Sequence, residues 1–270
     1  MSDAGRKVRL LISDVDGTLV THEKLLTPGT IAAVARLRAA GIGFTLVSAR
    51  PPSGLRRLAE TLDVRLPMAA YNGGILLDGD GSFAERHPID PVAALEFQAM
   101  VGAAPVSWWI FADGIWHADD LANPHVPRER LSSDQEPVIA PPTTDLVARA
   151  EKITLVSDDH ALLERLDAQG CAALRGRATI ARSQPYYLDM TDLCANKGAA
   201  VRALARMMDV PIEEVAVIGD MANDLPMFAV AGLSIAMGQA PPEVRGAAQL
   251  VTTSNEEDGV ANAIDWFLLD

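Results

Sequence analysis

The strongest constraint on this chain is an apolar segment, residues 10–13, that runs directly into Asp14 and Asp16 and then a glycine. A short run of β-forming residues that ends at a turn signal predicts a buried strand. The two carboxylates are then expected side by side on one face of the strand end, where each disfavours the ionisation of the other. The segment therefore predicts a cation, or a specific chemical task, at this position.

Strand-like and helical segments alternate in the first part of the chain. A helix is predicted after Thr27, which suits the N-cap position, with Pro28 in the first turn and Gly41 as the stop signal. Buried strands are predicted over residues 42–48 and 68–78, and a further helix lies between them. Alternation of this kind indicates a parallel sheet with helices on both faces.

The pattern changes after residue 82. Residues 91–101 have a helical pattern, whereas residues 106–118 form two β-runs around an Asp-Gly turn signal. Another strand is predicted over residues 152–158, and residues 171–191 have the pattern of a β-meander. This mixed stretch is large enough to form a second domain.

From about residue 196, strand-like and helical segments alternate again as they do in the first part of the chain. A strand is predicted over residues 214–220 and a helix at the end of the chain. The fold class expected is α/β, with a Rossmann-like, doubly wound parallel sheet built from both ends of the sequence. We therefore expect a core of residues 1–82 and 191–270, with an α+β cap domain inserted at residues 83–190.

Composition excludes several classes of partner. The chain has 23 basic and 36 acidic residues and a net charge of −13, which argues against nucleic acid or anionic membranes as partners. Cys171 and Cys194 form no CxxC pair, and a reducing compartment is the default for such a chain. The N-terminal segment lacks the apolar region of a signal peptide, so a cytoplasmic location is expected. A monomer and a homodimer both remain open.

Other chemically active side chains also stand at predicted strand ends or helix starts. Ser48 follows the second strand, Lys197 begins a helix, and Asp220, Asn223 and Asp224 follow a later strand. In open parallel sheets, ligands bind beyond the carboxyl ends of the strands. A group of carboxylates suits Mg²⁺, and a hydroxyl with a lysine suits a phosphate group bound beside it.

Four of these segments resemble the signature motifs of the haloacid dehalogenase superfamily of phosphohydrolases. They are "DVDGT", the strand-terminal Ser48, Lys197 and "GDMAND". Their order and the mid-chain insertion are similar to subfamily IIB, the Cof-type sugar-phosphate phosphatases, whose cap is of the C2B type. One such motif alone would be a moderate indication, but four in order over nearly the whole chain are a strong one.

The resemblance implies a role for each matched residue. Asp14 corresponds to the nucleophile that forms an aspartyl-phosphate, and Asp16 to the general acid–base. Mg²⁺ would be held by the Asp14 carboxylate, the Asp16 backbone carbonyl and Asp220, and would relieve the repulsion at the strand end. Ser48 and Lys197 would bind the transferring phosphoryl group.

The resemblance also implies that Asn223 helps to bind and orient the substrate, with Asp224 and Thr18 in supporting roles. Asp224 is equally well explained as a helix cap. Two positions depart from the usual pattern, since Ala49 replaces a glycine and Gln239 replaces an asparagine. Neither change removes a catalytic group, but both affect the surroundings of the expected phosphate site.

Several other residues invite a functional interpretation that we do not favour. The five histidines have no metal-ligand spacing in the sequence and are expected at the surface or in the hairpin. Trp108, Trp109 and Trp116 are expected to pack within the cap rather than to form a stacking platform.

The sequence thus predicts a Mg²⁺-dependent phosphatase that acts on a small phosphorylated metabolite, such as a sugar phosphate, a phosphorylated polyol or flavin mononucleotide. The inserted domain would close over the core and contact the leaving group. Two alternatives remain: a phosphotransferase or phosphomutase of the same superfamily, and a non-enzymatic sensor of a phosphorylated metabolite. The presence of Asp16 argues against the sensor.

Overall fold

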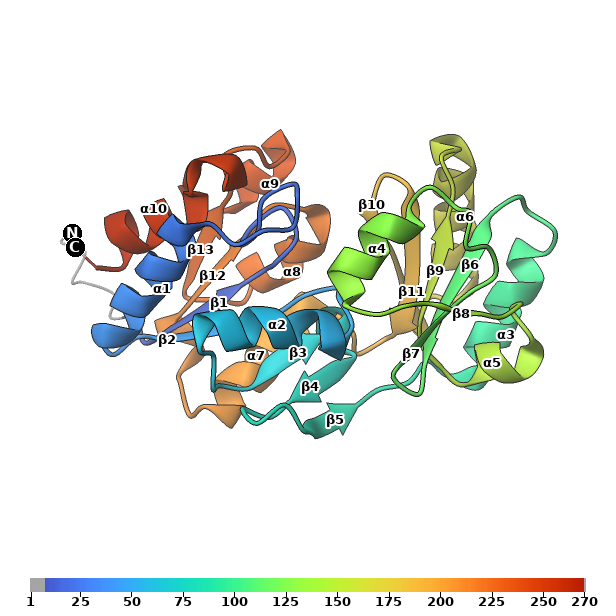
Figure 1. The fold of residues 1–270 in the computed structure, drawn as a ribbon, viewed down its shortest axis with the longest axis horizontal. Helices are drawn as coiled ribbons and strands as arrows, with labels where there is room; N and C mark the ends of the chain where they lie inside the picture. The colour runs from blue at the N-terminus through green and yellow to red at the C-terminus, as the bar shows by residue number, and fades with distance from the viewer. Residues whose placement is uncertain (1–7, 270) are drawn as a thin grey trace.

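Two lobes, each built on its own sheet, lie side by side along the long axis of the molecule (Figure 1). The computed structural model describes residues 8–269. The first lobe contains a five-stranded parallel sheet, in which β1 and β12 pair although they come from opposite ends of the chain. Its strands, in spatial order, are β14 (Leu250–Val251), β13 (Leu233–Ala236), β12 (Val215–Gly219), β1 (Leu10–Ser13) and β2 (Gly43–Leu46).

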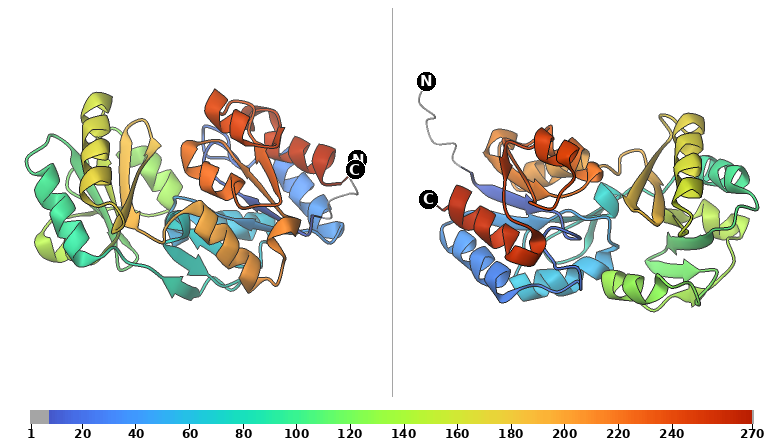
Figure 2. Two further views of the ribbon diagram at one scale, coloured as in Figure 1. Left: turned by 180° about the vertical axis from the view of Figure 1, so that it is seen from behind. Right: turned by 90° about the horizontal axis from the view of Figure 1, so that it is seen from above.

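Helices cover both faces of this sheet, as the alternating sequence predicted (Figures 1 and 2). Leu11 of β1 packs in one apolar cluster with α1 and α10, whereas Leu10 and Ile12 pack in another with α7. Successive residues of a strand point to opposite faces, so a strand buried on both sides must be apolar throughout. The helices are α1 (Pro28–Ala39), α2 (Pro52–Leu62), α7 (Lys197–Met207), α8 (Leu225–Phe228), α9 (Pro242–Ala247) and α10 (Gly259–Phe267).

The signals that predicted the first helix are all present in the structure. The Thr27 side chain accepts a hydrogen bond from the backbone N–H of Thr30, and Pro28 stands in the first turn. Gly41 follows the last turn with a φ of 81°, a conformation that costs glycine little.

Residues 68–78 form two strands where the sequence predicted one strand interrupted by a turn. The chain reverses at Tyr71 and Asn72, which both have positive φ, and β3 (Met68–Ala70) then pairs antiparallel with β4 (Ile75–Leu77). A third strand, β5 (Phe83–Arg86), pairs with β4. A parallel bridge from Val47 to Ala69 attaches this small sheet to the end of β2.

The second lobe contains a six-stranded sheet that is antiparallel except for the β7–β8 pair. One face is covered by α3 (Pro91–Val101), α5 (Thr144–Ala148) and α6 (His160–Ala173), and α4 (Val126–Ser133) lies toward the first lobe (Figure 1). The strands, in spatial order, are β10 (Ala178–Gln184), β11 (Tyr187–Asp192), β9 (Ala150–Val156), β6 (Ser107–Ala112), β7 (Ile115–Ala118) and β8 (Val138–Ile139).

The tryptophans of this lobe are buried, as the sequence predicted. Trp109 and Trp116 are fully buried and meet edge to face, with ring centroids 5.1 Å apart. They lie in the same apolar cluster as Phe111, whose ring is 5.8 Å from that of Tyr71 in the first lobe. The aromatic face of the sheet therefore packs the two lobes against each other, which leaves no stacking platform there.

The expectation of a β-strand at residues 171–176 is wrong. Residues 171–173 continue α6, and the chain leaves the helix at Leu174, whose side chain is buried. Helix formation is cooperative, so a residue that follows a well-formed helix continues it at little cost. The elements α4, β8 and α5 were not predicted, because residues 119–149 are rich in proline and polar residues and show no clear periodicity.

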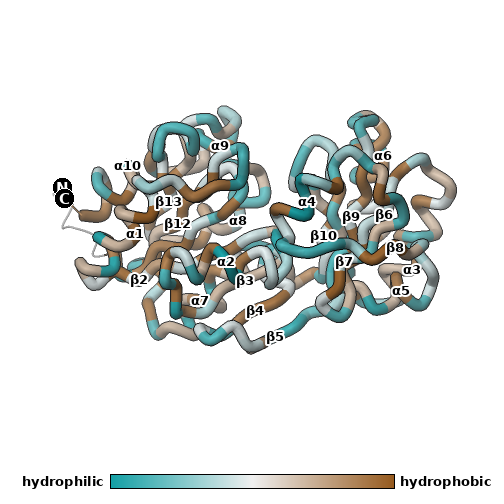
Figure 3. Tube along the Cα trace, in the orientation of Figure 1, coloured by the Kyte–Doolittle hydropathy of each residue, from teal (hydrophilic) through white to brown (hydrophobic). Residues whose placement is uncertain are grey.

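The chain passes from one lobe to the other at residues 87–90 and again at residues 193–196. The first crossing thus comes after β5, slightly later than the expected boundary at residue 82. Apolar residues run through the central strands of both lobes (Figure 3). Among the residues that the structure describes, no helix combines the length and the apolar character needed to cross a bilayer.

Gly54 marks the closest approach of α2 to α4. A Cβ atom at this position would lie 2.1 Å from the backbone carbonyl oxygen of Ser132. Gly54→Ala should therefore push α4 away from α2, although alanine favours the helix itself by about 1 kcal/mol. We expect amide hydrogen exchange in α4 to become faster by about tenfold. The control is Gly246→Ala in α9, where a Cβ meets nothing within 4 Å. Equal protection of α4 in both variants would contradict this role of Gly54.

Candidate active site

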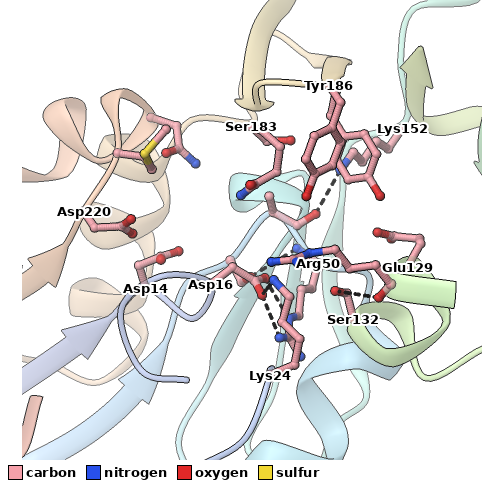
Figure 4. A pocket seen from close by; sticks show the side chains of 17 residues that line it. Asp14, Asp16, Lys24, Arg50, Glu129, Ser132, Lys152, Ser183, Tyr186 and Asp220 are labelled. Atoms are coloured by element: carbon pink, nitrogen blue, oxygen red, sulfur yellow. Dashed lines mark hydrogen bonds and ion pairs between the residues drawn. The ribbon is translucent and has the colours of Figure 1, made fainter. Parts of the chain in front are cut away.

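A pocket opens where β1, β2 and β12 end, opposite the second lobe (Figure 4). Its floor comes from the ends of these strands, and its roof comes from α4, β9 and the β10–β11 turn. The lining residues are Asp14, Asp16, Lys24, Ser48, Ala49, Arg50, Arg128, Glu129, Ser132, Lys152, Ser183, Gln184, Tyr186, Tyr187, Asp220, Met221 and Asn223. The strand ends thus meet at one edge, as expected for a parallel sheet.

Asp14 is buried and is paired with a buried lysine. The Lys197 Nζ atom lies 2.5 Å from an oxygen of Asp14 and 2.5 Å from an oxygen of Asp224. Burial opposes the charge on Lys197, but the two carboxylates outweigh it and raise the pKa of the lysine. Burial raises the pKa of Asp14 to about 6, and Lys197 limits that rise. The pair therefore places a carboxylate oxygen and a permanent positive charge at the end of β1.

Asp16 directs its carboxylate toward two cations (Figure 4). Arg50 donates to both of its oxygens, at 2.8 and 2.7 Å, and Lys24 donates at 2.5 Å. Burial alone would raise the pKa of Asp16, but Arg50 and Lys24 hold it well below its usual range. The two neighbouring aspartates therefore each have cationic partners within the protein. The sequence analysis assigned the relief of their repulsion to a metal ion alone. It did not foresee that cationic side chains from other segments also offset the two charges.

Asp220 and Asp224 hold the loop that follows β12. Asp224 accepts the backbone N–H groups of Asp220 and Met221, at 2.8 and 2.9 Å, while its other oxygen binds Lys197. The Asp224 side chain makes no capping hydrogen bond to α8, the role considered from the sequence, and instead closes the turn Ala222–Asp224 that precedes this helix. Asp220 accepts a hydrogen bond from Thr18 at 3.0 Å. Burial, together with the charges of Asp14 and Asp224, raises the pKa of Asp220 to about 8.

Three carboxylates at this edge fit a divalent cation. Oxygens of Asp14, Asp220 and Asp224 lie within 4.8 Å of one another. The raised pKa values of Asp14 and Asp220 reflect burial together with negative charge that a metal ion would offset. A hard oxygen donor set suits Mg²⁺. Gly17, with a φ of 84°, is needed here, because a Cβ atom would lie 2.4 Å from an oxygen of Asp220.

The remaining predicted residues also gather at this pocket. Ser48 is buried and accepts the backbone N–H of Arg50 at 3.2 Å. Asn223 lines the pocket and donates to Asn72 at 3.4 Å. Gln239, the unusual residue noted in the sequence, donates to the Gly17 carbonyl at 2.6 Å and so supports the loop after β1. Three further predicted residues do not line the pocket but bond to residues that do: Thr18, Lys197 and Asp224.

The second lobe contributes charged residues that the sequence analysis did not predict. Glu129 of α4 is 8% exposed, and burial raises its pKa to about 7, with Lys152 opposing that rise. Lys152 of β9 lies 3.0 Å from Asp189 and 3.3 Å from the carbonyl oxygen of Ala49. A lysine at the start of a predicted buried strand was a usable signal for Lys152, because lysine is rarely buried without a partner. Glu129 had none, since α4 itself was not predicted.

Comparisons with known proteins agree on one family. The family model described as haloacid dehalogenase-like hydrolase matches residues 11–264. A Haemophilus influenzae protein named as a candidate phosphatase is 31% identical over 263 residues, which cover 94% of this chain and 95% of the relative. A 5-amino-6-(5-phospho-D-ribitylamino)uracil phosphatase of Bacillus subtilis is 26% identical, with 97% and 96% covered.

The fold has close counterparts among solved structures. The crystal structure of a haloacid dehalogenase-like hydrolase from Bacteroides thetaiotaomicron superposes with a TM-score of 0.82 and 27% identity, covering 96% of this chain and 99% of that one. The resemblance drawn from four short motifs is thereby confirmed over nearly the whole sequence.

Proposed function

Because this chain belongs to the haloacid dehalogenase-like hydrolase family, we propose that it is a Mg²⁺-dependent phosphatase that hydrolyses a small phosphomonoester. The observation that carries the proposal is the arrangement at the end of β1. Asp14 is buried there beside Lys197, shares its pocket with Ser48 and Asp220, and stands next to a second carboxylate, Asp16.

In the proposed first step, an Asp14 carboxylate oxygen attacks the phosphorus atom of the substrate. A bond forms between that oxygen and phosphorus while the bond from phosphorus to the ester oxygen breaks, so the phosphoryl group passes to Asp14. In the second step, a water molecule attacks the same phosphorus and releases inorganic phosphate and free Asp14. A nucleophile attacks as its unprotonated form, so Asp14 must be ionised when the substrate binds.

Asp16 is the proposed proton carrier. It gives a proton to the departing ester oxygen in the first step and takes one from water in the second. In the structure Asp16 is held in its ionised form by Arg50 and Lys24. It must therefore leave these contacts and take up a proton from solvent water before it can give that proton to the ester oxygen.

Lys197 and Ser48 are proposed to stabilise the phosphoryl group in transit. Lys197 is positively charged and already bound to the nucleophile, so it can offset the charge that develops on the transferring oxygens without a large rearrangement. The ligands proposed for Mg²⁺ are the Asp14 carboxylate, the Asp16 backbone carbonyl and Asp220, with Asp224 beside them and already bound to Lys197 and the loop N–H groups. The metal, when bound, neutralises negative charge on the phosphate and orients it toward Asp14.

The second lobe, which lies between the two crossings, is proposed as the inserted cap domain that encloses the leaving group over the first lobe. The pocket is lined by residues of both lobes, so closure of the cap over the core would exclude water from a bound substrate. Glu129, Ser183 and Tyr186 present acceptor or hydroxyl groups from the cap side, which suits a leaving group with several hydroxyls (Figure 4).

Phosphate release from a panel of substrates tests the proposal directly. The panel comprises sugar phosphates, phosphorylated polyols, nucleotides, flavin mononucleotide and a chromogenic aryl phosphate, each assayed with Mg²⁺ and with a chelator. We expect release with Mg²⁺ and at least a 100-fold loss with the chelator, because the carboxylate cluster then lacks its counter-charge. Transfer of the phosphoryl group to a second hydroxyl, or binding without turnover, would overturn the assignment as a hydrolase.

The contribution of Glu129 is tested with the same panel. The assay is run at about pH 8.5, where Glu129 is ionised. Glu129→Gln then removes the charged acceptor but keeps the shape of the side chain, and a hydrogen bond to a charged group contributes about 1.5–3 kcal/mol. We expect kcat/KM for sugar and polyol phosphates to fall by about 10- to 100-fold. The aryl phosphate has no hydroxyl to donate and is the matched control, so its kcat/KM should change little. An equal loss of kcat/KM on both kinds of substrate would show that Glu129 does not bind the hydroxyl groups of the leaving group.

A further inference from the structure

A second group of metal-ligating side chains lies outside the pocket, where the chain passes between the lobes. His87 follows β5 on the first crossing, and Asp192 and Cys194 stand at the end of β11 on the second. One ligand atom from each of these three residues lies within 4.8 Å of the other two. The segments are distant in sequence, which is why ligand spacing in the sequence did not reveal the group.

We propose that His87, Asp192 and Cys194 bind a transition-metal ion of the Zn²⁺ type. Imidazole nitrogen, thiolate sulfur and carboxylate oxygen are the three ligand types that Zn²⁺ takes in proteins. In a tetrahedral site with bonds of about 2.0–2.3 Å, ligand atoms lie about 3.3–3.8 Å apart, so these donors need to close in by at most about 1.5 Å. The Cys194 side chain is exposed and the other two are partly exposed, so rotation of side chains can supply that movement.

Neighbouring groups hold the three donors in place. The Asp192 side chain accepts the backbone N–H of Cys194 at 2.8 Å, which keeps the carboxylate beside the thiol. The backbone N–H of His87 donates to the Gly74 carbonyl at 2.8 Å. A Glu85 oxygen lies 3.2 Å from the His87 Nε2 atom, where it can orient the ring or serve as a fourth ligand.

The donor set distinguishes this site from the one proposed for Mg²⁺. Mg²⁺ takes oxygen ligands and leaves a thiolate and an imidazole unused, whereas Zn²⁺ and Co²⁺ bind both. A metal ion bound here would also join residues from the two crossings. The proposal does not depend on the reaction that the pocket carries out, and its test needs no turnover.

Cobalt(II) titration of the full-length protein tests the site. The protein is stripped of metal and kept in excess Mg²⁺, which occupies the oxygen site, before Co²⁺ is added. We expect one equivalent to produce a thiolate-to-cobalt charge-transfer band in the near ultraviolet and visible bands typical of tetrahedral coordination. Zn²⁺ should then bleach both sets of bands by displacement.

Three variants assign the ligands. Cys194→Ser should abolish the charge-transfer band and lower the Co²⁺ affinity by at least about tenfold, and His87→Ala should lower the affinity to a similar degree. Cys171→Ser is the matched control, because Cys171 is also exposed and lies 3.3 Å from an Asp167 oxygen, yet it belongs to no such group among the described residues. The proposal is overturned if the wild type gives no charge-transfer band, or if the band survives Cys194→Ser.

Discussion

Replacement of Asp14 by asparagine should reduce phosphate release by roughly 10⁴-fold or more, the scale of loss seen when an enzyme is deprived of its nucleophile. The amide keeps the size of the side chain and can still contact Lys197, but it cannot form the bond to phosphorus. The loss should appear in kcat, because Ser48, Lys197 and the cap remain to bind the substrate. Release of inorganic phosphate from the best substrate of the panel provides the measurement.

A matched control separates this chemical effect from a general one. Asp265→Asn also removes one carboxylate, which pairs with Arg36 at the surface of the first lobe. We expect this control to keep the activity of the wild type. Circular dichroism should show both variants folded. If Asp14→Asn retained more than about a hundredth of the activity, Asp14 would not be the nucleophile. Direct attack of a water molecule on the phosphorus atom would then be the better explanation of phosphate release.

Replacement of Lys197 by methionine should lower the free energy of unfolding by about 3–5 kcal/mol in the presence of a chelator, the cost of removing one partner from a buried ion pair. The Lys197 ammonium contacts both Asp14 and Asp224, and Asp220 lies nearby. Without the ammonium, the two buried carboxylates of Asp14 and Asp224 lose their counter-charge. Urea unfolding at neutral pH measures the loss.

Two further conditions test the electrostatic cause. Mg²⁺ should restore part of the lost stability, since it supplies positive charge to the same carboxylates. The double variant Lys197→Met/Asp224→Asn should be more stable than the single variant, because one of the facing charges is gone while the amide oxygen can still accept the loop N–H groups. A loss below about 1 kcal/mol in the single variant, with no effect of either condition, would contradict this account.

The first lobe could be predicted from the sequence because the patterns that mark its strands and helices are local. A buried strand such as β1 must be apolar on both faces, and its end is marked by the change to Asp14 and Asp16. The parallel pairing of such strands then brings their ends to one edge, so the residues named from the sequence gather there. Their individual roles in catalysis remain predictions.

What the sequence could not predict depends on contacts between distant segments. Lys24 and Arg50 reach Asp16 from a loop and from the turn after β2, and nothing in their local pattern indicates that partner. Glu129 lies in a short helix whose apolar residues have no clear period. The group of His87 and Cys194 appears only after two chain crossings are brought together. Tertiary placement decides such pairs, and a local pattern holds no information about it.

The pairing of β1 with β12 also determines the order in which the protein can fold during synthesis. Leu10 pairs with Val215, so β1 has no partner on that side until about 200 further residues have been made. The second lobe, by contrast, is continuous in sequence between the two crossings and can form its sheet earlier. The carboxylates at the end of β1 therefore remain outside any finished site until Lys197 and Asp220 have been made. Nascent chains halted before β12 should contain a folded second lobe and an incomplete catalytic one.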